Sequence, residues 1–592
     1  MTLASRPLIL EPQSLVDAHE PDVTVTLDVP EDLRGLPGLL SIVARPLSPS
    51  PVVRKETREF EIPEHARLYF GYGVDEAGWI NGWPPVLFRV RSRDATGELS
   101  PPLFERRVDP AGEPRDRQWF DASVGLEDLE GRRVHFVFEA EALAGAPGVH
   151  VAHSFPVVSN PELRVARASA TEMPRSIVLV SLDTLRAQNV SAYGYARRTM
   201  PALERRLVAR GAMMRSAVAP VPFTPPSHMS MLTGVEPCVH GVSDQYSTLR
   251  PGLVTLAEVL RDAGYRTAAF TEDAYLVAGA GFERGFDRYF EERSEESAAP
   301  GFLEETFGAA ADWLRTHASS PFFLFVHTYS VHAPHSPPRG YQTLFRDDGG
   351  LGYPPKHRDA ALRYDQEIRY TDDILAELLD ALETQSFAKR TIVVVTSDHG
   401  EGFGEHYLTG HGFGVFDTTM RVPLVFRAPG LIPPGRVIDE QVSLVDLMPT
   451  LLELVEVPVP AQVQGHSFAS RLLGREDGFE ERPLVVRAGA VEGVRARRYK
   501  YIHRPGRGDK KSWEALYLIE EDPGERRNVL GEYGELVEEA RRILARDTES
   551  CAASRAAAAE ARGAEARIQK QPAWFIDREE IARKLRSLGY LE

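Results

Sequence analysis

The hydrophobic pattern divides the chain into two regions of different character. Up to about residue 170, β-branched and aromatic residues alternate with polar ones in short segments, which Pro- and Gly-rich turns separate. A period of two predicts strands with one buried face, and many short strands joined by turns are typical of an antiparallel sandwich. The predicted strands are residues 23–29, 39–47, 66–74, 86–93 and 133–143. We therefore expect an N-terminal all-β, jelly-roll-like sandwich domain over residues 1–172.

Beyond Pro174 the pattern changes to continuous apolar runs, which are typical of strands buried on both faces of a parallel sheet. The runs are residues 176–184, 322–329, 390–400 and 421–430. Segments with helical periodicity, such as residues 370–385, lie between them. The alternation of strand and helix predicts an α/β domain with a mostly parallel central sheet flanked by helices. We place this domain at residues 173–475, a small C-terminal α+β subdomain with an antiparallel sheet at 476–550, and a helical tail at 551–592.

Composition and charge exclude several classes of protein. With 43% hydrophobic and 26% charged residues, the chain resembles an ordinary soluble protein. A net charge of −17 repels phosphate backbones, so we expect no nucleic-acid partner. Only Cys238 and Cys551 are present, so we expect no disulfide framework. The first residues do not resemble a secretory signal, and no run approaches the ~18 apolar residues of a membrane span. These features predict a cytoplasmic protein.

Acids and imidazoles follow several of the predicted parallel strands. Asp183 ends the first strand, His327 and His332 end another, and Asp398 and His399 end a third. A lone residue of this kind is commonly a helix cap or a core histidine. In an open α/β sheet, however, ligands bind beyond the carboxyl ends of the strands, so three such strand ends together indicate a divalent-metal site.

Residues 223–234, FTPPSHMSMLTG, contain a candidate nucleophile. Thr224 precedes two prolines and a helix-compatible stretch, which predicts that Thr224 is the N-cap and Pro225 the first helical residue. A hydroxyl at the positive end of a helix lies where anions bind. Beside a metal, it could also attack a tetrahedral ester.

The order of these motifs resembles the sulfatase-like members of the alkaline phosphatase superfamily. The resemblance is carried by SLDTLRAQNVSAYGY (181–195), FTPPSHMSMLTGVEPCVHGV (223–242), HTYSVHAPHSPP (327–338) and TSDHGEGFGEHYLTGHG (396–412), together with GYRTAAF, FERGFDRYF, YDQEIRYTDDIL and MRVPLVF. It extends from about residue 175 to residue 592. It implies the sulfatase fold and a hydrolase of sulfate esters or related phosphorus esters.

The resemblance implies a metal site with one divalent ion. Asp183 matches the family's first metal-binding aspartate, and Asp398 and His399 match its metal-binding pair. Thr224 stands at the position of the nucleophile and would supply a nearby oxygen. Calcium is common among relatives, whereas the imidazole ligand favours manganese or zinc.

The resemblance also implies three histidines that contact the substrate. His332 matches a histidine beside the transferred group or the leaving oxygen. His411 occupies the place of a Lys or His that binds the anionic oxygens of the ester. His228 replaces an arginine that usually follows the nucleophile. We accordingly assign catalysis to Thr224, His332 and His411, and substrate binding to His228, His332 and His411.

The chain departs from the family's nucleophile signature. Sulfatases carry Cys or Ser in C/S-x-P-x-R and convert it to formylglycine, whereas this chain has Thr224 and His228. We therefore expect no formylglycine. Unmodified threonine nucleophiles occur among the phosphodiesterases and phospho-group transferases of the superfamily, which leaves a phosphodiesterase, a phosphonate monoester hydrolase or a transferase as alternatives. A catalytically inert binding protein of the same fold is a further alternative.

The expected partner is a small-molecule sulfate or phosphate ester. The N-terminal domain resembles modules that bind carbohydrate in some proteins and pack against an enzyme in others, so both roles stay open.

Overall fold

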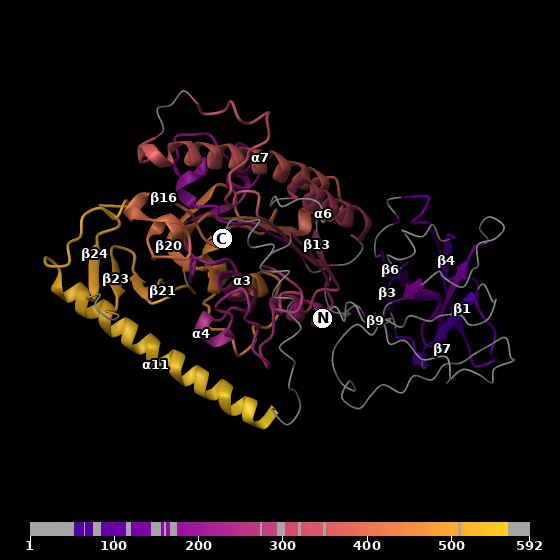
Figure 1. Cartoon of the computed structure of the whole chain (residues 1–592). Coiled ribbons are helices and arrows are strands. Elements are labelled where there is room, and N and C mark those ends of the chain that lie inside the picture. The colour runs from indigo at the N-terminus through magenta and orange to yellow at the C-terminus, as the bar shows by residue number, and fades with distance from the viewer. Residues whose placement is uncertain are drawn as a thin grey trace, which may run out of the picture. The chain divides into compact units, whose positions relative to one another are not determined.

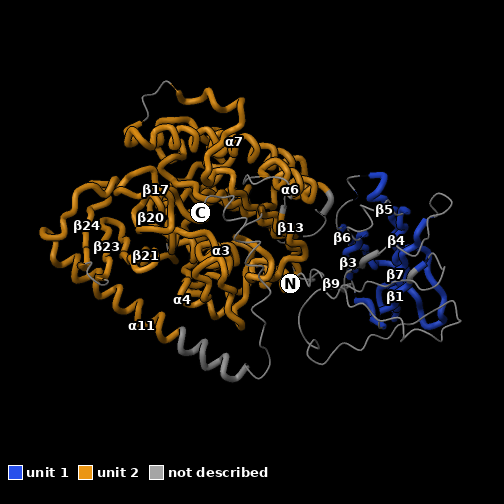
Figure 2. The backbone as a smooth tube through the Cα atoms, in the orientation of Figure 1, with its two compact units in different colours: residues 1–171 blue, residues 172–592 orange. Residues whose placement is uncertain are grey.

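The computed structural model describes residues 52–565, apart from gaps of which the longest are 75–83, 144–155, 166–174 and 293–301. The chain forms two compact units, residues 1–171 and 172–592 (Figure 2). The strands predicted at 23–29 and 39–47 lie outside the described residues, as does the predicted helical tail beyond residue 565.

The described part of the first unit contains two antiparallel sheets. One sheet contains β1 (Val52–Glu56), β7 (Arg133–Ala142), β4 (Val86–Arg93) and β5 (Phe104–Val108), with β2 (Phe60–Glu61) beside β7; the other contains β6 (Phe120–Gly125), β3 (Ala66–Val74), β8 (Pro156–Val158) and β9 (Glu162–Val165). Burial alternates along β4, as its sequence pattern predicts. The ring of Phe70 on β3 lies 5.4 Å from that of Phe138 on β7, so the two sheets share one apolar core.

The described part of the second unit is built on a sheet of nine strands. Their order is β13 (Arg288–Glu292), β12 (Arg266–Glu272), β14 (Phe322–Thr328), β10 (Ser176–Leu182), β15 (Thr391–Thr396), β19 (Leu424–Arg427), β11 (Ala212–Val218) and β18 (Arg421–Val422), with β20 (Arg436–Ser443) also beside β11. The four strands β12, β13, β14 and β10 pair in parallel, and β15 continues this arrangement. The predicted parallel core is confirmed.

The last of the predicted apolar runs forms a different local structure. Residues 421–430 are divided into β18 and β19 at Pro423, and β19 runs antiparallel to β15. Proline has no backbone N–H to donate to a ladder, which accounts for the interruption. The sheet is therefore mixed, although its centre is parallel.

Helices cover both faces of this sheet. Successive residues of its central strands point to opposite faces, and those on both faces are apolar. Val178 and Val180 of β10 face the cluster that contains residues of α2 (Pro201–Arg206), α6 (Leu303–His317) and α7 (Arg358–Glu383). Ile177 and Leu179 face the cluster that contains residues of α3 (Thr224–Thr233), α5 (Leu256–Asp262), α9 (Leu447–Leu454) and α10 (Ala469–Leu472). Figure 1 shows α6 and α7 on the opposite side of the sheet from α3.

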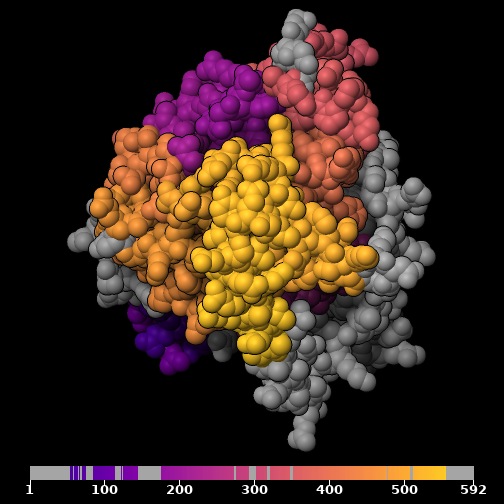
Figure 3. Space-filling model, turned by 90° about the vertical axis from the view of Figure 1, so that its left-hand side faces the viewer, coloured from indigo at the N-terminus to yellow at the C-terminus, as the bar shows by residue number. Residues whose placement is uncertain are grey.

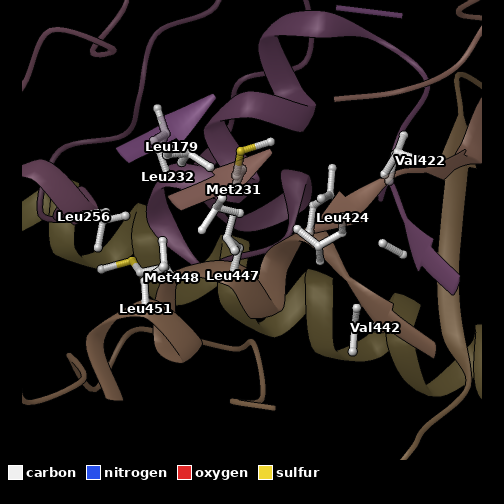
Figure 4. Close-up of a cluster of buried hydrophobic side chains, with 14 of the residues drawn as sticks. Leu179, Met231, Leu232, Leu256, Val422, Leu424, Val442, Leu447, Met448 and Leu451 are labelled. Atoms are coloured by element: carbon white, nitrogen blue, oxygen red, sulfur yellow. The ribbon is translucent and has the colours of Figure 1, made fainter. Parts of the chain in front are cut away.

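The core beneath α3 fixes the position of that helix. Met231 and Leu232 of α3 are buried with Leu179 of the sheet and with Leu447 and Leu451 of α9 (Figure 4). All residues of α3 are buried, so it is a rigid element. Its N-terminus carries Thr224, and packing therefore determines where that residue lies. Within the described part of the chain, no helix has the length and apolar content to cross a bilayer.

The C-terminal residues form a four-stranded antiparallel sheet and a long helix. The strands are β21 (Leu484–Ala488), β22 (Val491–Arg495), β23 (Lys500–Arg504) and β24 (Trp513–Tyr517), and the helix is α11 (Gly534–Glu565). On the face seen in Figure 3, these residues, in yellow, lie against the orange segments that precede them. Cys551 of α11 forms a disulfide with Cys238 of α4 (Pro237–His240). The expectation that cysteines do not hold the fold together is therefore corrected.

A buried cluster of charges joins the C-terminal sheet to the α/β domain. Lys500 of β23 lies 2.7 Å from a carboxylate oxygen of Asp417 and 3.0 Å from one of Glu525. Arg495 of β22 donates to the other oxygen of Asp417 at 2.9 Å. Burial raises the pKa of Asp417, but Arg495 and Lys500 outweigh this effect and hold the pKa well below its ordinary value. Asp417 begins α8 (Asp417–Met420), so the cluster fixes the segment that contains His411.

We predict that Lys500→Met lowers the free energy of unfolding by about 3–5 kcal/mol, because it leaves two buried carboxylates with one cation. Chemical denaturation followed by circular dichroism measures this loss. Lys511→Met, at an exposed position, is the matched control and should change stability by less than about 0.5 kcal/mol. Equal stability of the two variants would contradict the proposed importance of the cluster.

Candidate active site

Strand register brings the predicted acids together. Ser181 of β10 pairs with His327 of β14 on one side and with Thr396 of β15 on the other. Asp183 comes two residues after Ser181, and Asp398 comes two residues after Thr396. Both acids therefore lie at the same level, at the carboxyl ends of adjacent parallel strands. The edge where ligands bind in α/β sheets therefore contains both carboxylates.

Asp183, Asp398 and His399 form a compact group of ligand atoms. One atom from each side chain lies within 4.8 Å of the others, and all three residues are fully buried. The carboxylate atoms Asp183 Oδ1 and Asp398 Oδ2 have no hydrogen-bond partner within the described structure. Buried carboxylate oxygens are rarely left without a partner, so these residues fit a divalent cation.

The electrostatics of the group also fit a cation. Burial, followed by repulsion from Asp398, raises the pKa of Asp183 well above its ordinary value. Burial also raises the pKa of Asp398, but His399, His228 and other neighbours outweigh it and bring the pKa to about 2. Burial lowers the pKa of His399 to about 4, which leaves a neutral imidazole able to act as a ligand. A bound cation would relieve the repulsion between the carboxylates.

Thr184 holds the two acidic strand ends together. Its backbone N–H donates to Asp398 Oδ1 at 3.3 Å, and its carbonyl oxygen accepts a hydrogen bond from the Tyr364 hydroxyl at 2.8 Å. Thr184 has a φ of 57°, a left-handed conformation that is unfavourable for a β-branched residue. Such strain persists where the surrounding contacts impose it, and it is frequent at functional sites.

The hydroxyl of Thr224 faces this group. It lies 3.2 Å from Asp183 Oδ2 and 3.2 Å from His399 Nε2. The expectation that Thr224 is the N-cap is wrong: Phe223 is the N-cap of α3, and Thr224 is the first helical residue. The hydrogen bonds of the Thr224 hydroxyl are directed at the acid and the imidazole.

His228 lies one helical turn after Thr224 and is fully buried. Its Nδ1 lies 3.0 Å from the backbone oxygen of Thr224, and its Nε2 lies 2.9 Å from the Ser181 hydroxyl. Both ring nitrogens thus have protein partners. Contact between His228 and a substrate would require one of these hydrogen bonds to break.

His332 and His411 lie at the other side of the group. Their ring centroids are 5.0 Å apart, and the ring of His411 is 4.5 Å from that of His399. Burial lowers the pKa of His332 to about 3. His411 Nδ1 lies 3.3 Å from Glu401 Oε2. Although burial raises the pKa of Glu401, His411 and other imidazoles bring it to about 2, so this carboxylate is charged beside His411.

The sequence placed His327 at a strand end of the predicted metal site but gave it no individual role, and it did not single out Ser181 or Glu401. His327 Nε2 lies 3.4 Å from Asp183 Oδ2, and its Nδ1 has no hydrogen-bond partner within the described structure. The signal for His327 was present, since it is a polar residue inside a buried strand. Glu401 has no such signal, because its role depends on a contact with His411, ten residues later.

Comparisons with known proteins agree with this geometry. Residues 175–457 match the sulfatase family model, and residues 404–549 match the model described as N-sulphoglucosamine sulphohydrolase, C-terminal. The chain is 26% identical over 441 residues to a Δ4,5-hexuronate-2-O-sulfatase of Bacteroides thetaiotaomicron. The matched region covers 64% of this chain and 89% of the relative.

Two solved structures show the same fold. One, from work on glycosaminoglycan metabolism by Bacteroides thetaiotaomicron, has a TM-score of 0.56 and 20% identity, and covers 62% of this chain and 94% of the other. The phosphonate monoester hydrolase of Agrobacterium radiobacter has a TM-score of 0.53 and 20% identity, and covers 64% and 95%. With the motif order, the strand-end acids and the family matches in agreement, the second unit of this chain is a member of the sulfatase family of sulfuric ester hydrolases.

Proposed function

We propose that this protein hydrolyses sulfate esters with the unmodified hydroxyl of Thr224 as the nucleophile, at a site that holds one divalent cation. One observation carries the proposal: the Thr224 hydroxyl lies 3.2 Å from both Asp183 Oδ2 and His399 Nε2. A threonine that served only to begin α3 would have no need of this environment.

Asp183, Asp398 and His399 are the residues that would hold the cation. When bound, a divalent cation lowers the pKa of a neighbouring hydroxyl and offsets negative charge on the ester oxygens. Calcium, manganese and zinc all suit a site with two carboxylates and one imidazole. We propose His327 as an additional contact of Asp183 that keeps this carboxylate oriented.

Residues near Thr224 would carry out the attack on the ester, and His332 and His411 would contact the leaving oxygen and the other ester oxygens. The Thr224 oxygen attacks sulfur and forms the new O–S bond, while its proton passes to Asp183 Oδ2 or His399 Nε2, the atoms within reach. The S–O bond to the alcohol breaks, and the leaving oxygen takes a proton from water, which the neutral imidazole of His332 would orient. His411, with the charged Glu401 behind it, would bind the equatorial oxygens of the ester. Water then cleaves the threonine ester and restores the hydroxyl.

The role of His228 follows from its two hydrogen bonds. An arginine would bring a permanent charge beside the nucleophile, whereas burial lowers the pKa of His228 and keeps it neutral. We propose that His228 positions Thr224 by binding its backbone oxygen and by tying α3 to Ser181 of β10.

The identity of Thr224 supports a phosphorus ester as a second candidate substrate. Oxidation of a threonine hydroxyl gives a ketone, so this side chain cannot form the aldehyde hydrate by which formylglycine enzymes release sulfate. A threonine ester of phosphate or phosphonate is released by attack of water at phosphorus. Sulfate esters stand first because the matched family is a sulfatase family. The name of the hexuronate sulfatase relative makes sulfated sugars the first substrates to test.

A catalytically inert protein of this fold is the remaining alternative. A scaffold has no physical reason to bury Asp183, Asp398, Thr224 and His399 together, because burial of charged groups is costly without a compensating ligand. The metal content of the purified protein separates these hypotheses.

We predict about one equivalent of a divalent metal in the purified protein and less than about a tenth of that in Asp398→Ala, because this variant loses a charged ligand. Elemental analysis by plasma mass spectrometry measures the content. Asp439→Ala, at an exposed ion pair, should keep the metal. Full metal content in Asp398→Ala would place the metal elsewhere.

We predict that Thr224→Ala reduces kcat by about 10⁴-fold or more, whereas His411→Ala reduces it by about 10²–10³-fold. The nucleophile is part of every turnover, while a single charge-stabilising contact lowers the barrier only in part. Thr224→Ser keeps the hydroxyl and should retain measurable turnover. An unimpaired Thr224→Ala, with a metal content equal to that of the wild type, would mean that water attacks the ester directly.

We predict that the tryptic peptide covering residues 223–234 has the mass of the encoded sequence, with threonine at 224. Mass spectrometry of the intact peptide measures this. With the same preparation, kcat/KM for an aryl sulfate should exceed kcat/KM for the matched aryl phosphate, phosphodiester and phosphonate ester. A larger value for a phosphorus ester would establish the second candidate instead.

A further inference from the structure

Two aromatic side chains are exposed on the segment that contains His411. Among the large apolar side chains of the described residues, Tyr407 and Phe413 are the two most exposed; Tyr407 is fully accessible and Phe413 is 74% exposed. An exposed aromatic residue is ordinary when it stands alone, but two within seven residues beside a reactive site indicate a binding surface.

Phe413 follows the residue that ties the segment of His411 to the segment of Thr224. Its neighbour Gly412 donates a backbone hydrogen bond of 2.8 Å to the oxygen of Pro222, two residues before Thr224. His411 precedes this hydrogen bond and Phe413 follows it. The backbone of Phe413 therefore lies next to the contact between the segment of Thr224 and the segment of His411.

Tyr407 is held by a braced hairpin. The strands β16 (Gly402–Phe403), labelled in Figure 1, and β17 (Thr409–Gly410), labelled in Figure 2, pair around it. The turn is tied to the residues that follow Asp183, because Arg186 donates to the Glu401 backbone oxygen and to the Glu405 carboxylate, both at 2.9 Å. These contacts fix the hairpin to the segment that follows Asp183.

The backbone of the hairpin is strained in a way that exposes the ring. His406 and Tyr407 both have left-handed φ values, 52° and 61°. The ring of His406 stacks on Phe416 at 3.8 Å, so the strain at His406 is balanced by a contact, whereas the ring of Tyr407 faces solvent. Such conformations are unfavourable for residues other than glycine and are frequent at ligand clamps.

We propose that Phe413 and Tyr407 form a platform for the alcohol part of the ester, and that the substrate carries a ring with an apolar face, either a sugar or an aryl group. This inference rests on the proposed function. With the sulfate held beside Thr224 and His411, the carbon skeleton leaves the site past Phe413. A ring would bury its apolar face against these two side chains, and an aromatic side chain has only two side-chain torsions to order on binding.

The platform makes a prediction about selectivity. Relative to the wild type, Phe413→Ala should lower kcat/KM for an aryl sulfate and for a monosaccharide sulfate by about 10- to 100-fold, while kcat/KM for a short alkyl sulfate changes less than about threefold. Tyr407→Ala should act in the same direction. Phe413→Trp keeps a ring and should restore selectivity, and Tyr533→Ala, at an exposed aromatic outside the site, should leave all three substrates unchanged. Comparison of the aryl and monosaccharide esters identifies which ring the platform prefers.

Binding measurements test the platform without turnover. In the Thr224→Ala background, calorimetric titration with the aryl sulfate and with the monosaccharide sulfate should give a Kd about tenfold weaker for at least one of them when Phe413→Ala is added, with no change for the alkyl sulfate. Equal loss for all three esters, or loss for none, would overturn the platform while the proposed hydrolysis could still stand. If no ester is hydrolysed by the wild type, the proposed function fails, and the calorimetric result still decides the platform.

Discussion

Two carboxylates buried side by side are the constraint on which the rest of the site depends. Asp183 and Asp398 are fully buried on adjacent strands, and each retains an oxygen without a hydrogen-bond partner in the described structure. Repulsion between them is unfavourable in a medium of low dielectric constant. The imidazoles beside the carboxylates and the backbone N–H of Thr184, which donates to Asp398, reduce this repulsion. The geometry of the group also suits a divalent cation, which would reduce it further.

The same constraint accounts for the rigidity of the surrounding elements. A nucleophile is useful only when its hydroxyl is held within hydrogen-bond distance of the atoms that take its proton. Apolar packing of Met231 and Leu232 fixes α3 and thereby Thr224. On the opposite side, the Asp417 cluster anchors the segment of His411 to the C-terminal sheet. The C-terminal subdomain is thus a structural part of the site, although none of the candidate catalytic residues comes from it.

The replacement of the family's arginine by His228 is consistent with an unmodified threonine. An arginine at this position would be permanently charged, whereas burial lowers the pKa of His228. His228 instead binds the helix backbone and Ser181. The two departures from the family signature, Thr224 and His228, are therefore in direct contact, through the hydrogen bond between the His228 ring and the Thr224 backbone oxygen.

The sequence by itself determined the α/β class, the parallel strands and the candidate residues at their ends, because continuous apolar runs and strand-end acids are local signals. It also placed β3, β4 and β7 correctly, since alternation along each strand reports its buried face. The antiparallel direction of β19, the disulfide between Cys238 and Cys551 and the contact of Glu401 with His411 were decided by the tertiary structure. Each of these depends on the arrangement of segments in space, about which the hydrophobic pattern of either segment carries no information.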